Sequence, residues 1–281
     1  MNIFKASNYP FRIIERENKD YLIPYPLLLD DRGVVDIQCV SPIHGRSFIV
    51  GRYVNKKWII SKGNGLSYST YAFLNTGKND EQIWGMLSEE NARRDFIIGK
   101  EIQNLGIKTN EMEFVLRIEK EFIDCATHKS IFPYLLQYSV ECPYRICDFA
   151  FMPKDEFKQE IRHWAQMNEK SFSDLYLIAA NVLIKNLRIM HDNNIMHNAV
   201  HIQNYTWALE LLDFESSRTN THPYKSLEYE KHVPMLMTGE IIQTYEVINY
   251  IAWCLNEKMS YSAIDGLFRE YGFELNKFSV N

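Results

Sequence analysis

The pattern of apolar residues changes character along this chain, and that change most limits the folds available to it. Residues 1–75 are rich in β-branched and aromatic residues, contain few helix-period patterns and are interrupted by turn sequences. Later, apolar residues recur at helical spacing, first within residues 175–187 and again within residues 239–256. We therefore predict an α+β fold, with a sheet-rich first part and a helical second part.

Several elements of the first part can be placed from local signals. The clearest predicted hairpin joins residues 47–54 to residues 57–61 across a two-residue turn. A helix is predicted from about Ser88, a suitable N-cap that precedes two glutamates, to Asn104, and Gly106 is expected to end it.

Two more strands and one long helix complete the prediction. The strands are predicted for residues 114–122 and 132–140. Ser171 or Ser173 is predicted to cap the helix, which should stop near Asp192. The change of character places a division between residues 137 and 154, so we predict an N-terminal lobe of residues 1–145 and a C-terminal lobe of residues 146–281.

Composition excludes several classes of protein. The 281 residues are 46% hydrophobic, which is enough for a sizeable core, and no apolar stretch approaches the roughly 20 residues that a membrane span needs. The net charge of −5 creates no field that attracts nucleic acid, so we predict neither a membrane nor a nucleic-acid partner. Five cysteines without a CxxC pair, and no secretory signal at the N-terminus, predict a cytoplasmic protein.

The segment MHDNNIMHNAVHIQN, residues 190–204, carries the strongest functional signal, together with LLDFE at residues 211–215. These segments resemble the protein-kinase-like superfamily, especially the aminoglycoside and choline phosphotransferases. That branch has a loop of the form LHxxGIxHGDLHPxN and a metal-binding strand that ends in IDFE. The residues that match in type and order are His197, His201, Asn204, Asp213, Phe214 and Glu215.

The resemblance implies a magnesium site. An Asn amide oxygen and an Asp carboxylate are hard oxygen ligands that suit Mg²⁺, and Asn204 and Asp213 stand at the family's ligand positions. Taken one at a time, an Asn in a loop and an Asp after a strand are typical turn residues.

One position departs from the family. Where kinases place the catalytic Asp, this chain has Ala199, whose methyl group can neither orient nor deprotonate an acceptor hydroxyl. A natural Ala199 and an engineered replacement both remain open. His197 and His201 are the other catalytic candidates, and the structural alternative for His197 is a hydrogen bond to backbone near Asp213. A zinc site of the HExxH type is disfavoured, because no Glu lies between the histidines and Asn198 indicates a loop rather than a helix.

The first part carries a second resemblance, to selenoprotein O, a protein adenylyltransferase of kinase fold. WIISKGNG, followed by YS, resembles that family's LQLKGAG…YS, and ARRDFIIG with LGIKT resembles its SIREFLxSEAMxxLGIPTT. The resemblance implies that Lys62, beside Gly63 and Gly65, contacts ATP phosphates and that Asp95 stands where a helix carboxylate pairs with that lysine. Without the resemblance, Lys62 is equally consistent with an exposed hairpin lysine.

Two further positions bear on the kind of transfer. Arg145 matches one of two arginines with which that family accommodates ATP in an AMP-donating orientation, while Tyr138 stands at the other. The family's catalytic Asp, which directly precedes the metal-binding Asn, is Gln203 here.

The sequence therefore predicts a two-lobed, protein-kinase-like fold that binds ATP and Mg²⁺. The expected activity is transfer of AMP or phosphate to a protein, peptide or small-molecule acceptor, by positioning and electrostatics rather than by a general base. The alternatives are a pseudokinase that acts as a binding or scaffold module, and a kinase whose catalytic Asp was replaced by Ala199.

Overall fold

The computed structural model describes residues 3–40, 45–65, 85–123, 129–150, 175–224 and 226–274. These residues form a mixed α+β fold, as predicted. The chain divides into two compact units. Unit 1 comprises Met1–Gln103, Thr109–Tyr144 and Asp213–Glu215, and unit 2 comprises Asn104–Lys108, Arg145–Leu212 and Ser216–Asn281.

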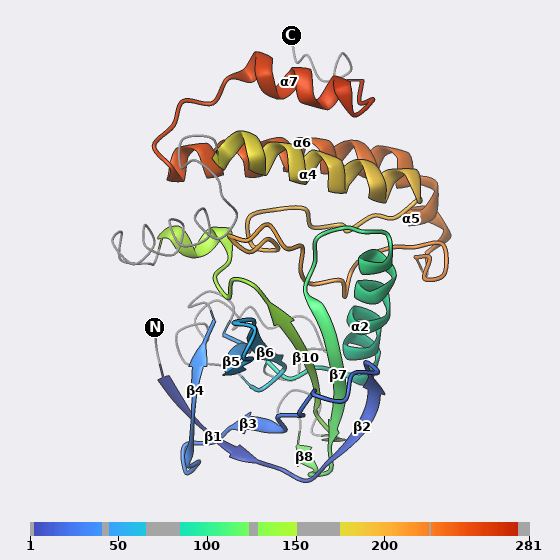
Figure 1. Ribbon diagram of the computed structural model, residues 1–281. Coiled ribbons are helices and arrows are strands. Elements are labelled where there is room, and N and C mark those ends of the chain that lie inside the picture. Colours follow the sequence, from blue (N-terminus) through green and yellow to red (C-terminus); the bar gives the residue numbers. More distant parts are fainter. Residues whose placement is uncertain are drawn as a thin grey trace. The chain divides into compact units, whose positions relative to one another are not determined.

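Unit 1 contains an antiparallel sheet whose described strands run in the order β2-β7-β10-β6-β5-β4-β1-β3 (Figure 1). These strands are β1 (Ile3–Asn8), β2 (Phe11–Arg16), β3 (Leu27–Leu29), β4 (Val35–Cys39), β5 (Ser47–Arg52), β6 (Trp58–Lys62), β7 (Glu111–Ile118) and β10 (Tyr134–Val140). A separate two-stranded ribbon pairs β8 (Phe122–Ile123) with β9 (Ser130–Ile131).

The predicted hairpin is confirmed as β5 and β6, which pair in antiparallel register. Its turn includes Lys56, which takes a left-handed φ of 71°. Lys62, the last residue of β6, pairs with Ser47 on one side and with Leu136 of β10 on the other. Lys62 therefore lies in the interior of the sheet, and its side chain is buried rather than exposed at a hairpin.

The predicted first helix is also confirmed. Helix α2 (Glu89–Asn104) begins directly after Ser88, whose Oγ accepts a hydrogen bond from the backbone N–H of Asn91 at 3.2 Å. Its backbone lies close to the side chain of Met112 on β7, since a Cβ added at Gly99 would lie 2.2 Å from Cε of Met112. Five of the six buried residues of α2, all except Ile98, recur at helical spacing along one side: Ala92, Asp95, Phe96, Gly99 and Ile102.

Strand β7 differs from its prediction in its bounds and in carrying a buried glutamate. It begins at Glu111 rather than residue 114 and ends at Ile118 rather than 122. Glu113 is only 2% exposed, and its Oε2 accepts hydrogen bonds from Tyr53 and from Gln137. Burial raises the pKa of Glu113. The alternation of polar and apolar residues does not predict a buried Glu in a strand. Glu113 is tolerated there because it lies at a shift in the β7–β10 register and has hydrogen-bonding partners.

Replacing Gly63 with Ala is expected to lower the free energy of unfolding by about 2–4 kcal/mol. Gly63 has a φ of +99°, and an added Cβ would lie 2.6 Å from the carbonyl oxygen of Tyr134. Gly106→Ala is the matched control, because its φ of +77° carries the same kind of strain but no atom lies within 4 Å of the added Cβ. Urea unfolding should show a clearly larger loss for Gly63→Ala, and equal losses would contradict the steric explanation.

Unit 2 is mainly helical. Its described helices are the short 3-10 helix η1 (Ile146–Ala150), α4 (Leu175–Asp192), α5 (Leu227–Lys231), α6 (Val233–Cys254) and α7 (Tyr261–Glu270). Helices α4 and α6 pack side by side (Figure 1). Helix α4 ends at the predicted Asp192, while the predicted caps Ser171 and Ser173 lie outside the described residues.

Helix α6 starts six residues before its predicted beginning at Gly239. His232 is the N-cap and Pro234 lies in the first turn, where the missing N–H of proline costs no hydrogen bond. The periodicity of apolar residues alone missed this turn, although Pro234 is a recognised start signal.

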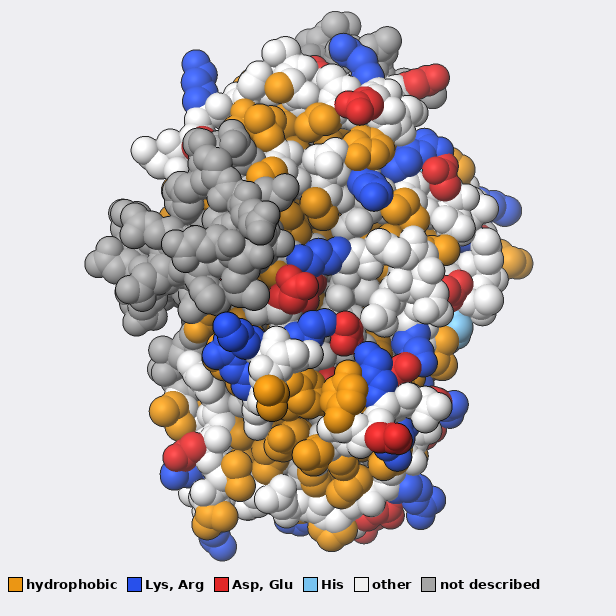
Figure 2. Space-filling model, in the orientation of Figure 1, with side chains coloured by type: hydrophobic (Ala, Val, Ile, Leu, Met, Phe, Trp, Pro, Cys, Tyr) orange, Lys and Arg blue, Asp and Glu red, His pale blue; other side chains and the backbone are white. Residues whose placement is uncertain are grey.

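The surface of the described residues mixes charged and apolar side chains. Figure 2 shows Lys and Arg beside Asp and Glu over the visible face, with hydrophobic side chains between them. No helix in the described part of the chain is long and apolar enough to cross a membrane.

Candidate functional site

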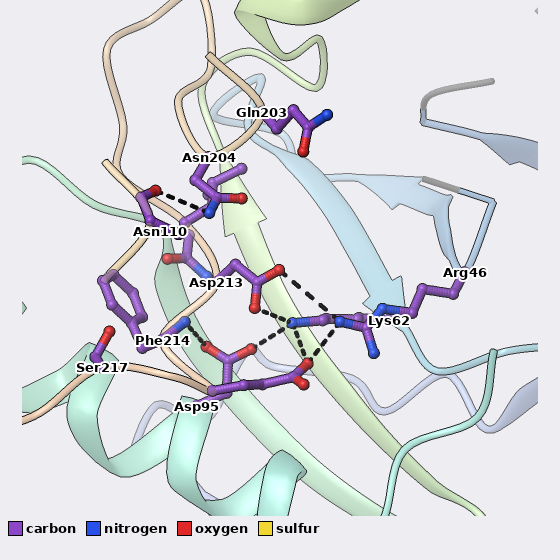
Figure 3. Close-up of polar contacts among 12 residues, drawn as sticks. Arg46, Lys62, Asp95, Asn110, Gln203, Asn204, Asp213, Phe214 and Ser217 are labelled. Carbon is purple, nitrogen blue, oxygen red and sulfur yellow. Dashed lines mark hydrogen bonds and ion pairs between the residues drawn. The ribbon is translucent and has the colours of Figure 1, made fainter. Parts of the chain in front are cut away.

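Lys62 lies at the centre of a group of charged residues in unit 1 (Figure 3). We call Lys62, Arg46, Asp95, Asp213 and Glu215 the Lys62 cluster. The Nζ of Lys62 lies 2.7 Å from Oδ2 of Asp95, 2.9 Å from Oδ1 of Asp213 and 2.6 Å from Oε1 of Glu215. The ammonium therefore has a carboxylate partner for each of its three N–H donors.

Asp95 connects the lysine to the segment that follows the predicted metal-binding strand. Its Oδ2 accepts from Lys62, and its Oδ1 accepts a hydrogen bond from the backbone N–H of Phe214 at 2.9 Å. The short side chain of Asp95 thus reaches the lysine directly from helix α2. Phe214 is fully buried and lies against Gly99, so helix α2 fixes both Asp95 and the backbone next to Asp213.

Three carboxylates face two cations in the Lys62 cluster, which leaves one excess negative charge. Burial of the ammonium acts to lower the pKa of Lys62, but attraction to Asp213, Asp95 and Glu215 outweighs burial and raises the pKa above its ordinary value. Lys62 is therefore a permanent cation at neutral pH.

The same carboxylates can also be considered as ligands of a metal ion. Oxygen atoms of Asp95, Asp213 and Glu215 all lie within 4.8 Å of one another. Their side chains are 2%, 24% and 16% exposed respectively, so Asp213 and Glu215 are accessible to an ion from solvent whereas Asp95 is not. Carboxylate oxygens are hard ligands that fit Mg²⁺. The donor chemistry at Asp213 therefore suits the predicted ion.

The predicted catalytic residues of unit 2 lie together in one loop, residues 195–204, which we call the His197 loop. His197 is fully buried, and its Nε2 lies 2.8 Å from the carbonyl oxygen of Leu212. The backbone hydrogen bond predicted for His197 as a structural residue is present. The Nδ1 of His201 accepts a 3.3 Å hydrogen bond from the backbone N–H of Gln203, so that ring helps to hold the loop.

Ala199 and Asn204 are held next to each other within the His197 loop. The Nδ2 of Asn204 donates to the carbonyl oxygen of Ala199 at 3.0 Å, and the backbone N–H of His201 donates to the same oxygen. Because the amide nitrogen of Asn204 is turned to Ala199, its Oδ1 is the atom through which this side chain could bind a cation.

Helix α6 supplies two side chains that support the backbone on either side of Ala199. Oε1 of Glu240 accepts from the N–H of Asn198 at 2.7 Å, and Oε1 of Gln243 accepts from the N–H of Val200 at 3.0 Å. Glu240 is 1% exposed, and its other oxygen lies 3.0 Å from Nε2 of His191. Glu240 and Gln243 were not predicted as site residues, because the apolar pattern of this helix predicted only packing.

The remaining predicted residues have separate surroundings. Arg145, in unit 2, is 2% exposed, and its Nη1 donates to the carbonyl oxygen of Gln203 at 2.8 Å, so it anchors the residue before Asn204. In unit 1, Gly63 and Gly65 have φ values of +99° and +112°, and both belong to the turn that follows Lys62. The YS pair of the selenoprotein O resemblance lies outside the described residues.

Arg46 is the member of the Lys62 cluster that sequence analysis missed. Its Nη2 lies 2.9 Å from Oε1 of Glu215 and 3.8 Å from Oδ2 of Asp213. The one sequence signal for Arg46 is its position directly before the predicted hairpin. The two ends of a hairpin lie close together, so Arg46 comes near Lys62 at the other end.

Comparison with known proteins adds no family to this geometry. No protein-family model matches the chain, and no curated protein matches it.

Proposed function

We propose that this chain is an ATP- and magnesium-dependent transferase of two-lobed, protein-kinase-like fold, related to selenoprotein O. It transfers AMP or phosphate to a protein, a peptide or a small molecule. The observation that carries the proposal is the Lys62 cluster, in which a lysine from a central strand, a helix carboxylate and the Asp of the DFE segment meet within 3 Å of one ammonium. That combination of elements is the one the two sequence resemblances imply.

Each residue has a physical role in this proposal. Lys62 supplies a fixed positive charge for phosphate oxygens, and Asp95 holds its ammonium in place. Asp213 would hold Mg²⁺, and the sequence motif adds Asn204 as a second oxygen ligand. Bound Mg²⁺ supplies charge neutralisation on the polyphosphate and a fixed orientation for the leaving group.

The bond that forms distinguishes the two versions of the reaction. For AMP transfer, an acceptor oxygen bonds to the α-phosphorus, and pyrophosphate leaves. For phosphate transfer, the acceptor oxygen bonds to the γ-phosphorus and ADP leaves. In both versions the acceptor proton passes to water, because Ala199 offers no base, so the rate enhancement comes from positioning and electrostatics.

A scaffold without catalysis is the second candidate function, and the residue at position 199 favours it. The methyl group of Ala199 and the amide of Gln203 replace the two acidic bases found in the families that the chain resembles. A scaffold could still bind nucleotide through the Lys62 cluster, so nucleotide binding and nucleotide turnover must be measured separately.

Asp213→Ala is expected to weaken the binding of Mg·ATP at least about tenfold, because the ion loses a carboxylate ligand. Calorimetric titration of Mg·ATP into the full chain and into the variant measures this change. Asp36→Ala is the matched control, since Asp36 is a mostly exposed Asp of the same unit that pairs with Lys5. Unchanged affinity in Asp213→Ala, or no binding by the unaltered chain, would overturn the proposed nucleotide site.

Turnover then separates the transferase from the scaffold. ATP labelled at the α-phosphate should leave its label on an acceptor if AMP is transferred, and ATP labelled at the γ-phosphate should do so if phosphate is transferred. Metal-dependent binding with no label transferred, over a range of acceptors and divalent metals, is the result expected of the scaffold.

A further inference from the structure

A single carboxylate oxygen bridges the two cations of the Lys62 cluster. Oε1 of Glu215 lies 2.6 Å from Nζ of Lys62 and 2.9 Å from Nη2 of Arg46. Both distances are those of charge-assisted hydrogen bonds. The oxygen thus occupies a position where two basic side chains converge on one anionic atom, Lys62 from the end of β6 and Arg46 from the residue before β5.

The backbone fixes these two cations beside each other. The carbonyl oxygen of Arg46 accepts a hydrogen bond from the N–H of Gly63 at 2.8 Å, directly next to Lys62. Arg46 precedes Ser47, which is the register partner of Lys62. The distance between the two side-chain origins is therefore set by the β5–β6 pairing and does not depend on Glu215.

A lysine and an arginine held side by side match the chemistry of a polyphosphate. Arg presents a planar fork of donors, and Lys presents a compact charge, so together they can bind oxygens of one phosphate or of two neighbouring phosphates. A carboxylate oxygen satisfies the same donors when no phosphate is present.

We propose that Arg46 and Lys62 together form the polyphosphate-binding position of this site, and that the carboxylate of Glu215 fills this position until a phosphate group displaces it. The choice of a polyphosphate as ligand rests on the proposed function. Arg46 is then a second phosphate-binding cation beside Lys62, and Glu215 is a built-in competitor that lowers the affinity of the site.

Glu215 is better suited to leave than Asp95, and it is the carboxylate that lies within 3 Å of both cations. Asp95 is buried and also accepts the N–H of Phe214, so its displacement would break a second hydrogen bond. The side chain of Glu215 is longer and more exposed than that of Asp95. When Glu215 leaves, Lys62 keeps Asp95 and Asp213 as partners, so its buried charge stays compensated.

The test uses inorganic tripolyphosphate with a chelator present, so that no metal ion contributes to binding. Glu215→Gln removes the competing charge at nearly constant shape and is expected to bind tripolyphosphate about tenfold more tightly than the unaltered chain. Arg46→Gln is expected to bind it about tenfold less tightly, because one of the two cations is lost.

The matched control is Glu111→Gln, which changes the net charge by the same amount. Glu111 lies in the same unit and pairs with Lys57 and Lys19 instead of the cluster. Its affinity for tripolyphosphate should remain that of the unaltered chain. Thermal unfolding checks that each variant is folded. Glu215→Asp, whose side chain is one methylene shorter, is a second variant, and its affinity for tripolyphosphate is expected to lie between those of the unaltered chain and Glu215→Gln.

The outcomes separate this inference from the proposed function. Tighter binding by Glu215→Gln and weaker binding by Arg46→Gln support the inference even if no ATP turnover is ever found. An affinity of Glu215→Gln equal to or below that of the unaltered chain overturns it, even if Mg·ATP binds and Asp213→Ala loses that binding. Absence of tripolyphosphate binding in every variant also overturns it. An equal gain in Glu111→Gln would assign the effect to net charge and overturn the competitor role of Glu215.

Discussion

Lys62→Met is expected to lower the free energy of unfolding by about 3–5 kcal/mol, because it leaves a buried carboxylate without its counter-charge. Asp95 is 1% exposed, and in the variant its nearest charged neighbours would be the carboxylates of Asp213 and Glu215. The aliphatic part of Met fills most of the space of the lysine, so the loss measures charge rather than a cavity. Urea unfolding of the full chain gives the value.

Two further variants isolate the cause of this loss. Lys62→Met combined with Asp95→Asn should be more stable than Lys62→Met alone, since Asn carries no charge and its amide oxygen can still accept the N–H of Phe214. Lys57→Met, on the same hairpin, breaks a pair with Glu111 whose side chains are both about a quarter exposed, and should cost less than about 1 kcal/mol. A loss in Lys62→Met no larger than in Lys57→Met would show that the buried pair contributes no more than a surface pair.

Glu240→Leu is expected to cost about 2–4 kcal/mol, because two groups lose the buried carboxylate with which they hydrogen-bond. The N–H of Asn198 and the ring of His191 both hydrogen-bond the Glu240 carboxylate. Amide hydrogen exchange should show, in addition, that protection of the Asn198 N–H falls, since the His197 loop loses its support from α6.

The controls for Glu240 use the same helix. Glu246→Leu makes the same chemical change at an exposed position of α6 and should change the stability by less than about 0.5 kcal/mol. Glu240→Gln keeps an oxygen for the Asn198 N–H and should cost about 1 kcal/mol. If Glu240→Leu left the exchange of the Asn198 amide unchanged, α6 would not be holding the loop.

The elements that could be predicted from sequence are those whose signals are local. The β5–β6 hairpin has two alternating runs and a short turn, and α2 has a capping serine with an apolar face repeated every three or four residues. These signals need no knowledge of distant residues. The start of α6 at Val233 was not predicted, because the prediction rested on the spacing of apolar residues and not on Pro234 as a helix-start signal.

The candidate site was predicted only where a motif names its residues. Lys62, Asp95 and Asp213 came from segments that resemble known families, and the structure brings these three together in unit 1. Arg46 belongs to no such segment, and its contact with Glu215 joins residues 169 positions apart. Pairing at that separation depends on how the sheet and the DFE segment fold, which neither periodicity nor composition encodes.

The His197 loop shows the same limit. Its histidines were expected as catalytic candidates, and the hydrogen bond of His197 to Leu212 agrees with the structural alternative. Glu240 was unpredictable because a buried Glu on an apolar helix has no sequence signal until its partners, Asn198 and His191, are known. Buried charge is informative only once its partners are seen.

Asp213, Phe214 and Glu215 belong to unit 1, although Leu212 before them and Ser216 after them belong to unit 2. A gene fragment that stops at Tyr144 would encode the sheet and α2 but omit two of the three carboxylates around Lys62. Exchange of gene segments between related chains by a single crossover near residue 145 would likewise join a lysine from one parent to a DFE segment from the other. The two parts of the Lys62 cluster are therefore encoded more than a hundred codons apart, and a charge lost from one part leaves the other without its partner.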